Sequence, residues 1–214
     1  MARRILVAGV LVLGALGVWA MAMAFSFAPP VSKTNAPGEN FCSDCHTGGV
    51  NLAGGSLDIQ NVPANYTPGQ TYAITVQLQR TGQQRWGFEL VPLRDSLTTQ
   101  VFAGQLTTTS ATTILQSGVV AGRTRFYVGH FSGGALDGTF FGTVNGPVSW
   151  TFDWKAPSAG AGTVTFYCAG NAANGNGSSG AGDVIYTATK TSAEATGTAV
   201  SETTWGKIKS LYLK

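Results

Sequence analysis

The residues best suited to chemistry are two cysteines and a histidine within five consecutive positions, Cys42-Ser-Asp-Cys45-His46. The chain has only three cysteines and two histidines, so this stretch holds most of its soft metal ligands. Two thiols at this spacing can add to the two vinyl groups of a haem, and a histidine directly after the second thiol can reach the iron. The motif therefore predicts one covalently bound c-type haem, attached through Cys42 and Cys45, with His46 as the proximal iron ligand.

Three other interpretations of this motif remain. A zinc site needs four ligands, and adjacent cysteine and histidine residues rarely bind the same zinc ion. A redox-active cysteine pair usually opens a helix in an α/β fold, for which the sequence shows no pattern. A disulfide between Cys42 and Cys45 would close a loop too short to constrain the chain much.

The sixth ligand of such a haem has one candidate. All three methionines lie in the first 23 residues, inside the expected leader, so His130 is the candidate distal ligand. The alternative is a surface or hydrogen-bonded histidine. Two histidine ligands would favour electron transfer at low potential over substrate binding.

Other polar residues give weaker signals. Cys168 alternates with Val164 and Phe166 on an apolar strand face, which predicts a buried, inert thiol. The run from Asn171 to Gly182 contains only small and polar residues, which predicts a turn-rich loop; with Asp183 it could also bind calcium through oxygens. No nucleophile motif accompanies the second histidine, so hydrolase chemistry is excluded.

The amino terminus has the features of an export signal. Arg3 and Arg4 precede an apolar stretch over residues 5–19, and Ala22-Met-Ala24 is a cleavage signal. We expect a signal peptide over residues 1–24 and a periplasmic or extracellular protein. An uncleaved anchor helix is the alternative, since the apolar run is long enough to cross a bilayer.

Charge and cysteine number exclude two further classes. Removal of residues 1–24 takes away two arginines and lowers the formal net charge from +3 to +1, so nucleic acid is excluded as a partner. Three cysteines cannot form two disulfides, so a disulfide framework is excluded as well.

The elements that must position the motif are β-strands. Apolar and polar residues alternate over five stretches, at 72–78, 86–90, 148–154, 164–168 and 184–189. Weaker strands are expected at 56–62, 112–117 and 123–128. About eight strands at this spacing predict an all-β, immunoglobulin-like β-sandwich over residues 53–192. It would follow an irregular haem-binding segment, 25–52, and precede a tail, 193–214, with a short terminal helix.

Several stretches together resemble the choice-of-anchor V family of exported bacterial proteins, whose domain is similar to the reeler domain of reelin. The stretches that carry the resemblance are Phe41 to Gly49, Tyr66 to Tyr72, Arg85 to Leu90, Trp150 to Pro157 and Phe166 to Asn176. The resemblance implies a reeler-type sandwich and a histidine at the end of the strand that contains His130, which supports iron ligation there. The chain departs from many members in ending on residues 207–214 rather than on a membrane span, and in having Cys168 where a small apolar residue is expected.

These observations predict an exported monohaem c-type cytochrome that exchanges electrons with redox protein partners and is not an enzyme. The alternative is a surface adhesion or assembly module that self-associates and in which haem is structural or sensory. A third hypothesis is a peroxidase or gas sensor, which requires an open iron site and therefore a His130 that does not bind the iron.

Overall fold

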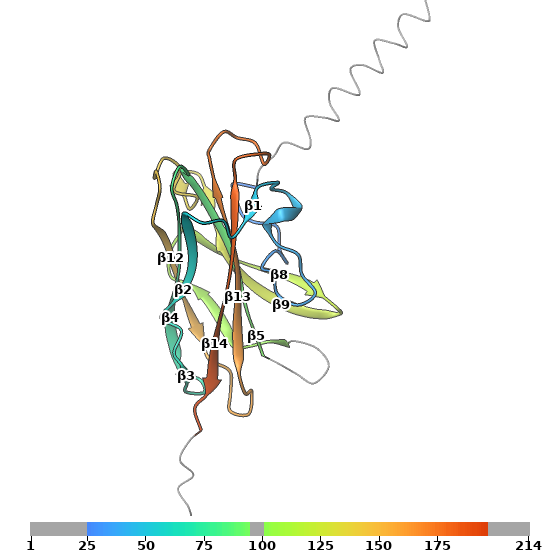
Figure 1. Ribbon diagram of the computed structural model, residues 1–214. Coiled ribbons are helices and arrows are strands. Elements are labelled where there is room, and N and C mark those ends of the chain that lie inside the picture. Colours follow the sequence, from blue (N-terminus) through green and yellow to red (C-terminus); the bar gives the residue numbers. More distant parts are fainter. Residues whose placement is uncertain (1–24, 95–100, 197–214) are drawn as a thin grey trace, which may run out of the picture.

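The computed structural model describes residues 25–94 and 101–196, and its regular structure is almost entirely β (Figure 1). The eight expected strands are all present. They are β2 (Gly55–Gln60), β4 (Thr71–Arg80), β5 (Arg85–Arg94), β8 (Thr113–Val120), β9 (Arg123–His130), β12 (Val148–Lys155), β13 (Val164–Ala173) and β14 (Val184–Glu194). The shorter elements are the 3-10 helix η1 (Cys42–Asp44) and the strands β1 (Gly49–Val50), β3 (Asn65–Tyr66), β6 (Val101–Phe102), β7 (Gln105–Thr108), β10 (Ser132–Gly133) and β11 (Leu136–Asp137).

The long strands form two layers, so the predicted all-β sandwich is confirmed (Figure 1). One sheet has the order β2-β4-β12-β7. The other has eight strands in the order β1-β14-β13-β5-β9-β8, with β3 added beside β14 and β6 beside β5. β10 and β11 form a separate hairpin. Among the described residues no helix has the length and hydrophobicity to cross a membrane.

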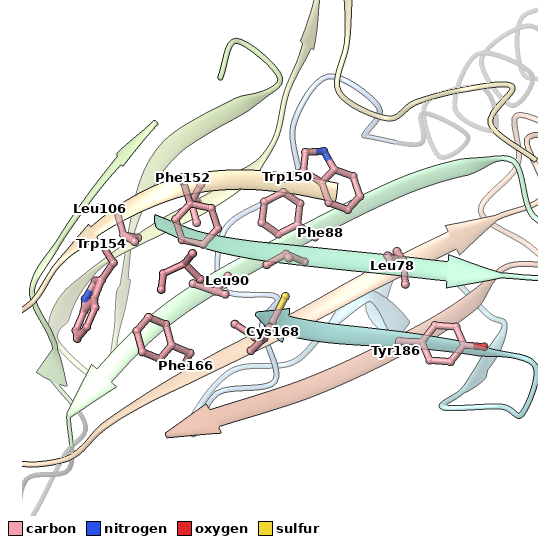
Figure 2. Close-up of a cluster of buried hydrophobic side chains, with 14 of the residues drawn as sticks. Leu78, Phe88, Leu90, Leu106, Trp150, Phe152, Trp154, Phe166, Cys168 and Tyr186 are labelled. Carbon is pink, nitrogen blue, oxygen red and sulfur yellow. The ribbon is translucent and has the colours of Figure 1, made fainter. Parts of the chain in front are cut away.

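Aromatic side chains from both sheets fill the space between the layers (Figure 2). The ring of Phe88 lies 4.6 Å from that of Trp150, and Phe166 packs edge-on against Trp154 at 4.9 Å. Cys168 is fully buried among them, as predicted, and burial raises the pKa of its thiol well above the ordinary value. Alternate residues of β5 and β13 supply this core because successive strand side chains point to opposite faces.

The outer face of the eight-stranded sheet is covered by the chain that precedes β1. Ala36 packs with Val91, Leu93 and Tyr127, which project from β5 and β9 away from the sandwich core. A buried ion pair joins the same layers, since Arg125 Nη1 lies 2.5 Å from Glu39 Oε1. Residues 25–48, predicted to be irregular, thus form a third, partial layer.

One detail differs from the sequence predictions, and others fall on residues that the structure does not describe. The expected loop at 171–182 starts only after Ala173, because residues 171–173 pair with Gly87, Trp86 and Arg85 at the start of β5. Small side chains allow turns, but they also fit a strand that packs closely against its neighbours. The predicted terminal helix, most of the tail at 193–214, and the signal peptide lie outside the described residues.

Candidate functional site

A cleft of about 830 Å³, including its opening to solvent, lies over one end of this outer face. Gly87 and Glu89 of β5 and Asn171 and Ala173 of β13 line it, and because they alternate with core residues they face away from the core. The four residues predicted from the sequence to hold a haem all line this one cleft: Cys42, Cys45, His46 and His130.

The cysteine motif forms a tight turn at the wall of the cleft. The amides of Cys45 and His46 both donate to the carbonyl of Cys42, at 3.2 and 2.9 Å, and this fold brings the three side chains to the same wall. All three cysteines of the chain are free thiols. Cys45 is exposed, whereas Cys42 is partly buried, and this burial raises the pKa of the Cys42 thiol to about 12. Such a thiol is protonated at neutral pH, unlike the reactive cysteine of a redox pair.

A short parallel ladder attaches the motif to the sheet. Gly49 and Val50 of β1 pair with Val184 and Ile185 at the start of β14. The approach is so close that a Cβ atom at Gly48 would lie 1.6 Å from the carbonyl oxygen of Asp183. Glycine at position 48 is therefore required for this docking.

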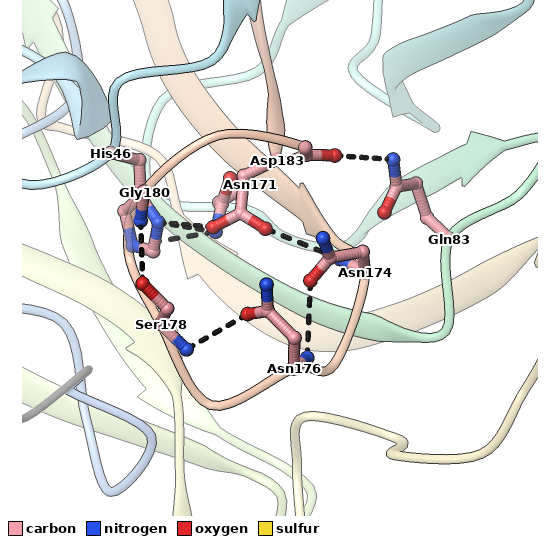
Figure 3. Close-up of polar contacts among 9 residues, drawn as sticks. His46, Gln83, Asn171, Asn174, Asn176, Ser178, Gly180 and Asp183 are labelled. Atoms are coloured by element: carbon pink, nitrogen blue, oxygen red, sulfur yellow. Dashed lines mark hydrogen bonds and ion pairs between the residues drawn. The ribbon is translucent and has the colours of Figure 1, made fainter.

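His46 has a carboxylate partner (Figure 3). Its Nδ1 lies 2.6 Å from Oδ2 of Asp183, whose side chain is only 1% exposed. The amide nitrogen of Asn171 lies at similar distances, 3.2 and 3.3 Å, from Nδ1 and Nε2, so the amide lies against the imidazole ring. With Nδ1 bonded to Asp183, Nε2 is the nitrogen left for a metal.

His130 lies at the point where the ladder between β5 and β9 ends. The last backbone pair of this ladder is Glu89 with Gly129. Beyond it, the imidazole of His130, rather than a strand backbone, contacts the backbone of Phe88. Its Nδ1 lies 3.2 Å from the amide nitrogen and 3.4 Å from the carbonyl oxygen of Phe88, and its Nε2 lies 3.3 Å from the carbonyl oxygen of Phe25. The Phe88 amide donates to Nδ1 and Nε2 faces a carbonyl oxygen, so the proton of the neutral ring lies on Nε2 in this arrangement, and iron ligation through Nε2 would require that proton to move and the contact with Phe25 to break.

Burial decides the charge of His130. The residue is 6% exposed, and burial lowers the pKa of its imidazole to about 4. It is therefore neutral near pH 7, which is the form that binds a metal. A Cβ atom at Gly87 would lie 2.8 Å from Cε1 of this ring, so the absence of a side chain at position 87 leaves the space that the ring occupies.

Glu89 is a buried carboxyl group in the cleft that sequence analysis missed. Its Oε2 accepts a hydrogen bond from the Lys33 amide at 2.6 Å, but its Oε1 is buried and has no partner among residues 25–94 and 101–196. Burial raises the pKa of Glu89 to about 8. A sequence signal was present, because Leu90 to Leu93 are apolar at every position, which indicates a strand covered on both faces.

The loop after β13 uses its side-chain oxygens internally (Figure 3). Asn174, Asn176 and Ser178 each accept a hydrogen bond from the backbone amide two residues further on. Both carboxylate oxygens of Asp183 are also used, by His46 and by the Asn174 amide. This arrangement matches the predicted turn-rich loop that packs on the site, rather than the calcium-binding alternative.

The residues present fit a covalently bound haem. The cleft has a mostly apolar lining, two free thiols and two imidazoles, and Nδ1 of His46 has a carboxylate partner, as is usual for a metal-binding histidine. Asn171 Oδ1 and Glu89 Oε1 are buried at the same site without a partner within the described chain. No group of three or more His, Cys, Asp or Glu side chains in that part of the chain is arranged to hold a bare metal ion. A haem iron takes its equatorial ligands from the macrocycle and needs only one or two side chains.

No protein-family model matches the chain, and no curated protein is significantly similar to it. Among solved structures, it is similar to the reeler domain of human F-spondin, with 19% identity, a TM-score of 0.43, and coverage of 70% of this chain and 95% of that one. A second structure, the Reelin-N domain of F-spondin, gives 20% identity, the same TM-score, and coverage of 72% and 96%. AvmM, which catalyses macrocyclization in alchivemycin A biosynthesis, gives 18%, 0.40, and coverage of 71% and 94%. At these values we draw no conclusion about family or activity from them.

Proposed function

We propose that the chain is an exported monohaem c-type cytochrome whose haem lies in the cleft over the outer face of the eight-stranded sheet. The observation that supports this most is that Cys42, Cys45 and His46 line the same cleft as His130, which is far from them in sequence. His130 is buried in the wall of this cleft rather than on the surface, and its ring contacts the backbone of Phe88 and Phe25.

Each of these residues has a defined role in the proposal. Cys42 and Cys45 hold the haem by thioether bonds, and His46 and His130 bind the iron through Nε2. Haem supplies a one-electron couple, and two histidine ligands leave no coordination position for a substrate. The chain itself excludes water with its third layer and keeps both imidazoles oriented. Electron transfer is therefore favoured over catalysis.

The proposed partners are redox proteins outside the cytoplasm, in the periplasm or at the cell surface. Cys45 is exposed, so one attachment point lies at the protein surface, where a partner can approach. Neither nucleic acid nor a membrane is part of the proposal, apart from the leader segment discussed above.

The test is to produce the protein together with a cytochrome c maturation system and to record its denatured mass and its absorption spectra. The expected product carries one haem that survives denaturation and is low-spin in both oxidation states. His130→Ala should retain the covalent haem but become high-spin. Cys42→Ala should lose a thioether bond, whereas Cys168→Ala, which removes a thiol from the core, is the matched control and should retain both. A protein without covalent haem would refute the proposal.

A second candidate function, self-association as an assembly module, has one observation in its favour. Leu115 and Val119 of β8 flank Phe126 of β9 on one face of the sheet, and they are 41%, 69% and 47% exposed. Along the described path of the sheet, β8 is the last strand. Exposed apolar residues at a sheet edge are typical of association surfaces. Sedimentation at increasing concentration tests it: the wild type should associate and Val119→Lys should not, and a wild type that stays monomeric would refute it.

A further inference from the structure

The two histidines of the cleft have different partners for Nδ1. His46 Nδ1 lies 2.6 Å from the carboxylate of Asp183, whereas His130 Nδ1 has only backbone neighbours, the Phe88 amide that donates to it at 3.2 Å and the Phe88 carbonyl at 3.4 Å. A buried carboxylate is a far stronger acceptor than a peptide carbonyl, because it carries a full charge and little water competes for it. The two prospective ligands are thus made unequal by their surroundings.

We infer that Asp183 is a positioning residue that fixes His46 as the tautomer with its proton on Nδ1 and makes it the more strongly electron-donating of two unequal iron ligands. This inference rests on the proposed function. Hydrogen bonding from Nδ1 to a carboxylate increases the basicity of Nε2. A more basic ligand stabilises the oxidised iron more than the reduced iron, so Asp183 lowers the reduction potential.

Several contacts hold the carboxylate of Asp183 in place. Its Oδ1 accepts the Asn174 amide at 3.2 Å, which orients Oδ2 toward the imidazole. Its backbone is fixed on one side by the close approach of Gly48 and on the other by the first residue of β14, which pairs with β1. The preceding carbonyl, that of Gly182, accepts a hydrogen bond from the side chain of Gln83 at 2.8 Å. A residue can orient a metal ligand only if its own side chain and backbone are held in place, and these contacts hold Asp183.

Asn171 completes the cage around the ring. Its amide lies against the imidazole of His46, and its Oδ1 is buried without a partner. The ring therefore has a hydrogen-bond acceptor at one edge, an amide along its face and the cleft at the remaining edge. Rotation of the ring would break the bond to Asp183.

The experiment compares the reduction potentials of the holoprotein and of its Asp183→Asn and Asp58→Asn variants. Asp183→Asn replaces the charged acceptor by a neutral one and should shift the one-electron equilibrium at least tenfold toward the reduced state, which is about 59 mV. Asp58, an exposed residue of β2, provides the matched control, since its substitution removes the same charge but should leave the potential unchanged. An unchanged potential in Asp183→Asn with full haem attachment would overturn the inference.

A second measurement covers the case in which Asp183→Asn does not fold. In His130→Ala the reduced iron is expected to be five-coordinate, and the resonance Raman band of the iron–His46 bond then reports how strongly Nδ1 is hydrogen-bonded. The inference predicts a frequency typical of carboxylate-bonded imidazoles, and a frequency typical of carbonyl-bonded ones would contradict it. The two failures are distinguishable, because absence of covalent haem refutes the proposed function, whereas haem with an ordinary histidine band refutes only the role of Asp183.

Discussion

The two faces of the eight-stranded sheet are built from alternating residues of the same strands, yet one face carries an apolar core and the other carries the polar groups of the cleft. On the inner face Phe88 and Cys168 lie in a dry aromatic core. On the outer face, at odd-numbered positions of the same two strands, lie Gly87, Glu89 and Asn171, and Glu89 and Asn171 carry buried polar atoms that have no partner in the described chain. The aromatic core and the candidate haem site thus lie on opposite faces of the same strands, and the predictions below test whether the two can be altered separately.

The largest effect is expected from the inner face. Phe166→Ala removes a fully buried ring that packs on Trp154 at 4.9 Å. It should lower the free energy of unfolding by about 3–5 kcal/mol, measured by denaturant titration. The haem spectrum of the folded protein should not change. A loss below about 1 kcal/mol, or a change of spin state, would contradict the separation of the two faces.

The ion pair beneath the third layer should come next. Glu39→Ala leaves the Arg125 guanidinium buried without its carboxylate and takes an acceptor from the Tyr127 hydroxyl. Removing one partner of a buried pair costs about 3 kcal/mol or more. Because residue 39 is in the segment that carries the motif, both the stability and the yield of covalent haem should fall. A normal yield would mean that the covering segment folds independently of this pair.

A smaller effect confined to the outer face is expected from Gly87→Ala. The new methyl group would lie within 3 Å of two atoms of the His130 ring, which must move. We expect a cost of about 1–3 kcal/mol and a shift of the holoprotein from low spin toward high spin. Ala172→Gly, at the position that pairs with Trp86 on the inner face, serves as a control that should leave the spin state unchanged. A fully low-spin Gly87→Ala protein would contradict the packing described for His130.

Glu89 should give the haem-free chain a pH dependence. Burial raises the pKa of its carboxyl from 4.5 to about 8, so the folded state binds this proton more tightly than the unfolded state does. The contribution of Glu89 is therefore most favourable below pH 4.5 and is lost as the pH rises toward 8, by up to about 1.4 kcal/mol per pH unit. Glu89→Gln should abolish this slope in denaturant titrations from pH 5 to 8. An equal slope in the variant would show that another group is responsible.

Much of the fold can be predicted from the local pattern of apolar and polar residues, whereas the arrangement of the cleft cannot. Strands such as β12 could be predicted because Val148, Trp150, Phe152 and Trp154 alternate with polar residues, and burial of that face is a local requirement. The cysteine motif was visible because its chemistry depends on spacing along the chain alone.

The pairing of His46 with Asp183 joins residues 137 positions apart, through the parallel ladder of β1 with β14. No local signal encodes such a contact. Asp183 was noticed only as the single carboxylate near a loop of small residues, and Glu89 was not noticed at all. Their roles depend on tertiary burial, which turns an ordinary acidic residue into a ligand partner or an uncharged group.

The central claim is that His46 and His130 would both bind the iron of one haem, and near-infrared magnetic circular dichroism of the oxidised holoprotein at low temperature tests it most directly. That spectrum distinguishes iron with two imidazole ligands from iron with one imidazole and water or a backbone group. The account predicts the two-imidazole signature in the wild type and its loss in His130→Ala. A wild-type spectrum that already shows a single imidazole would contradict it.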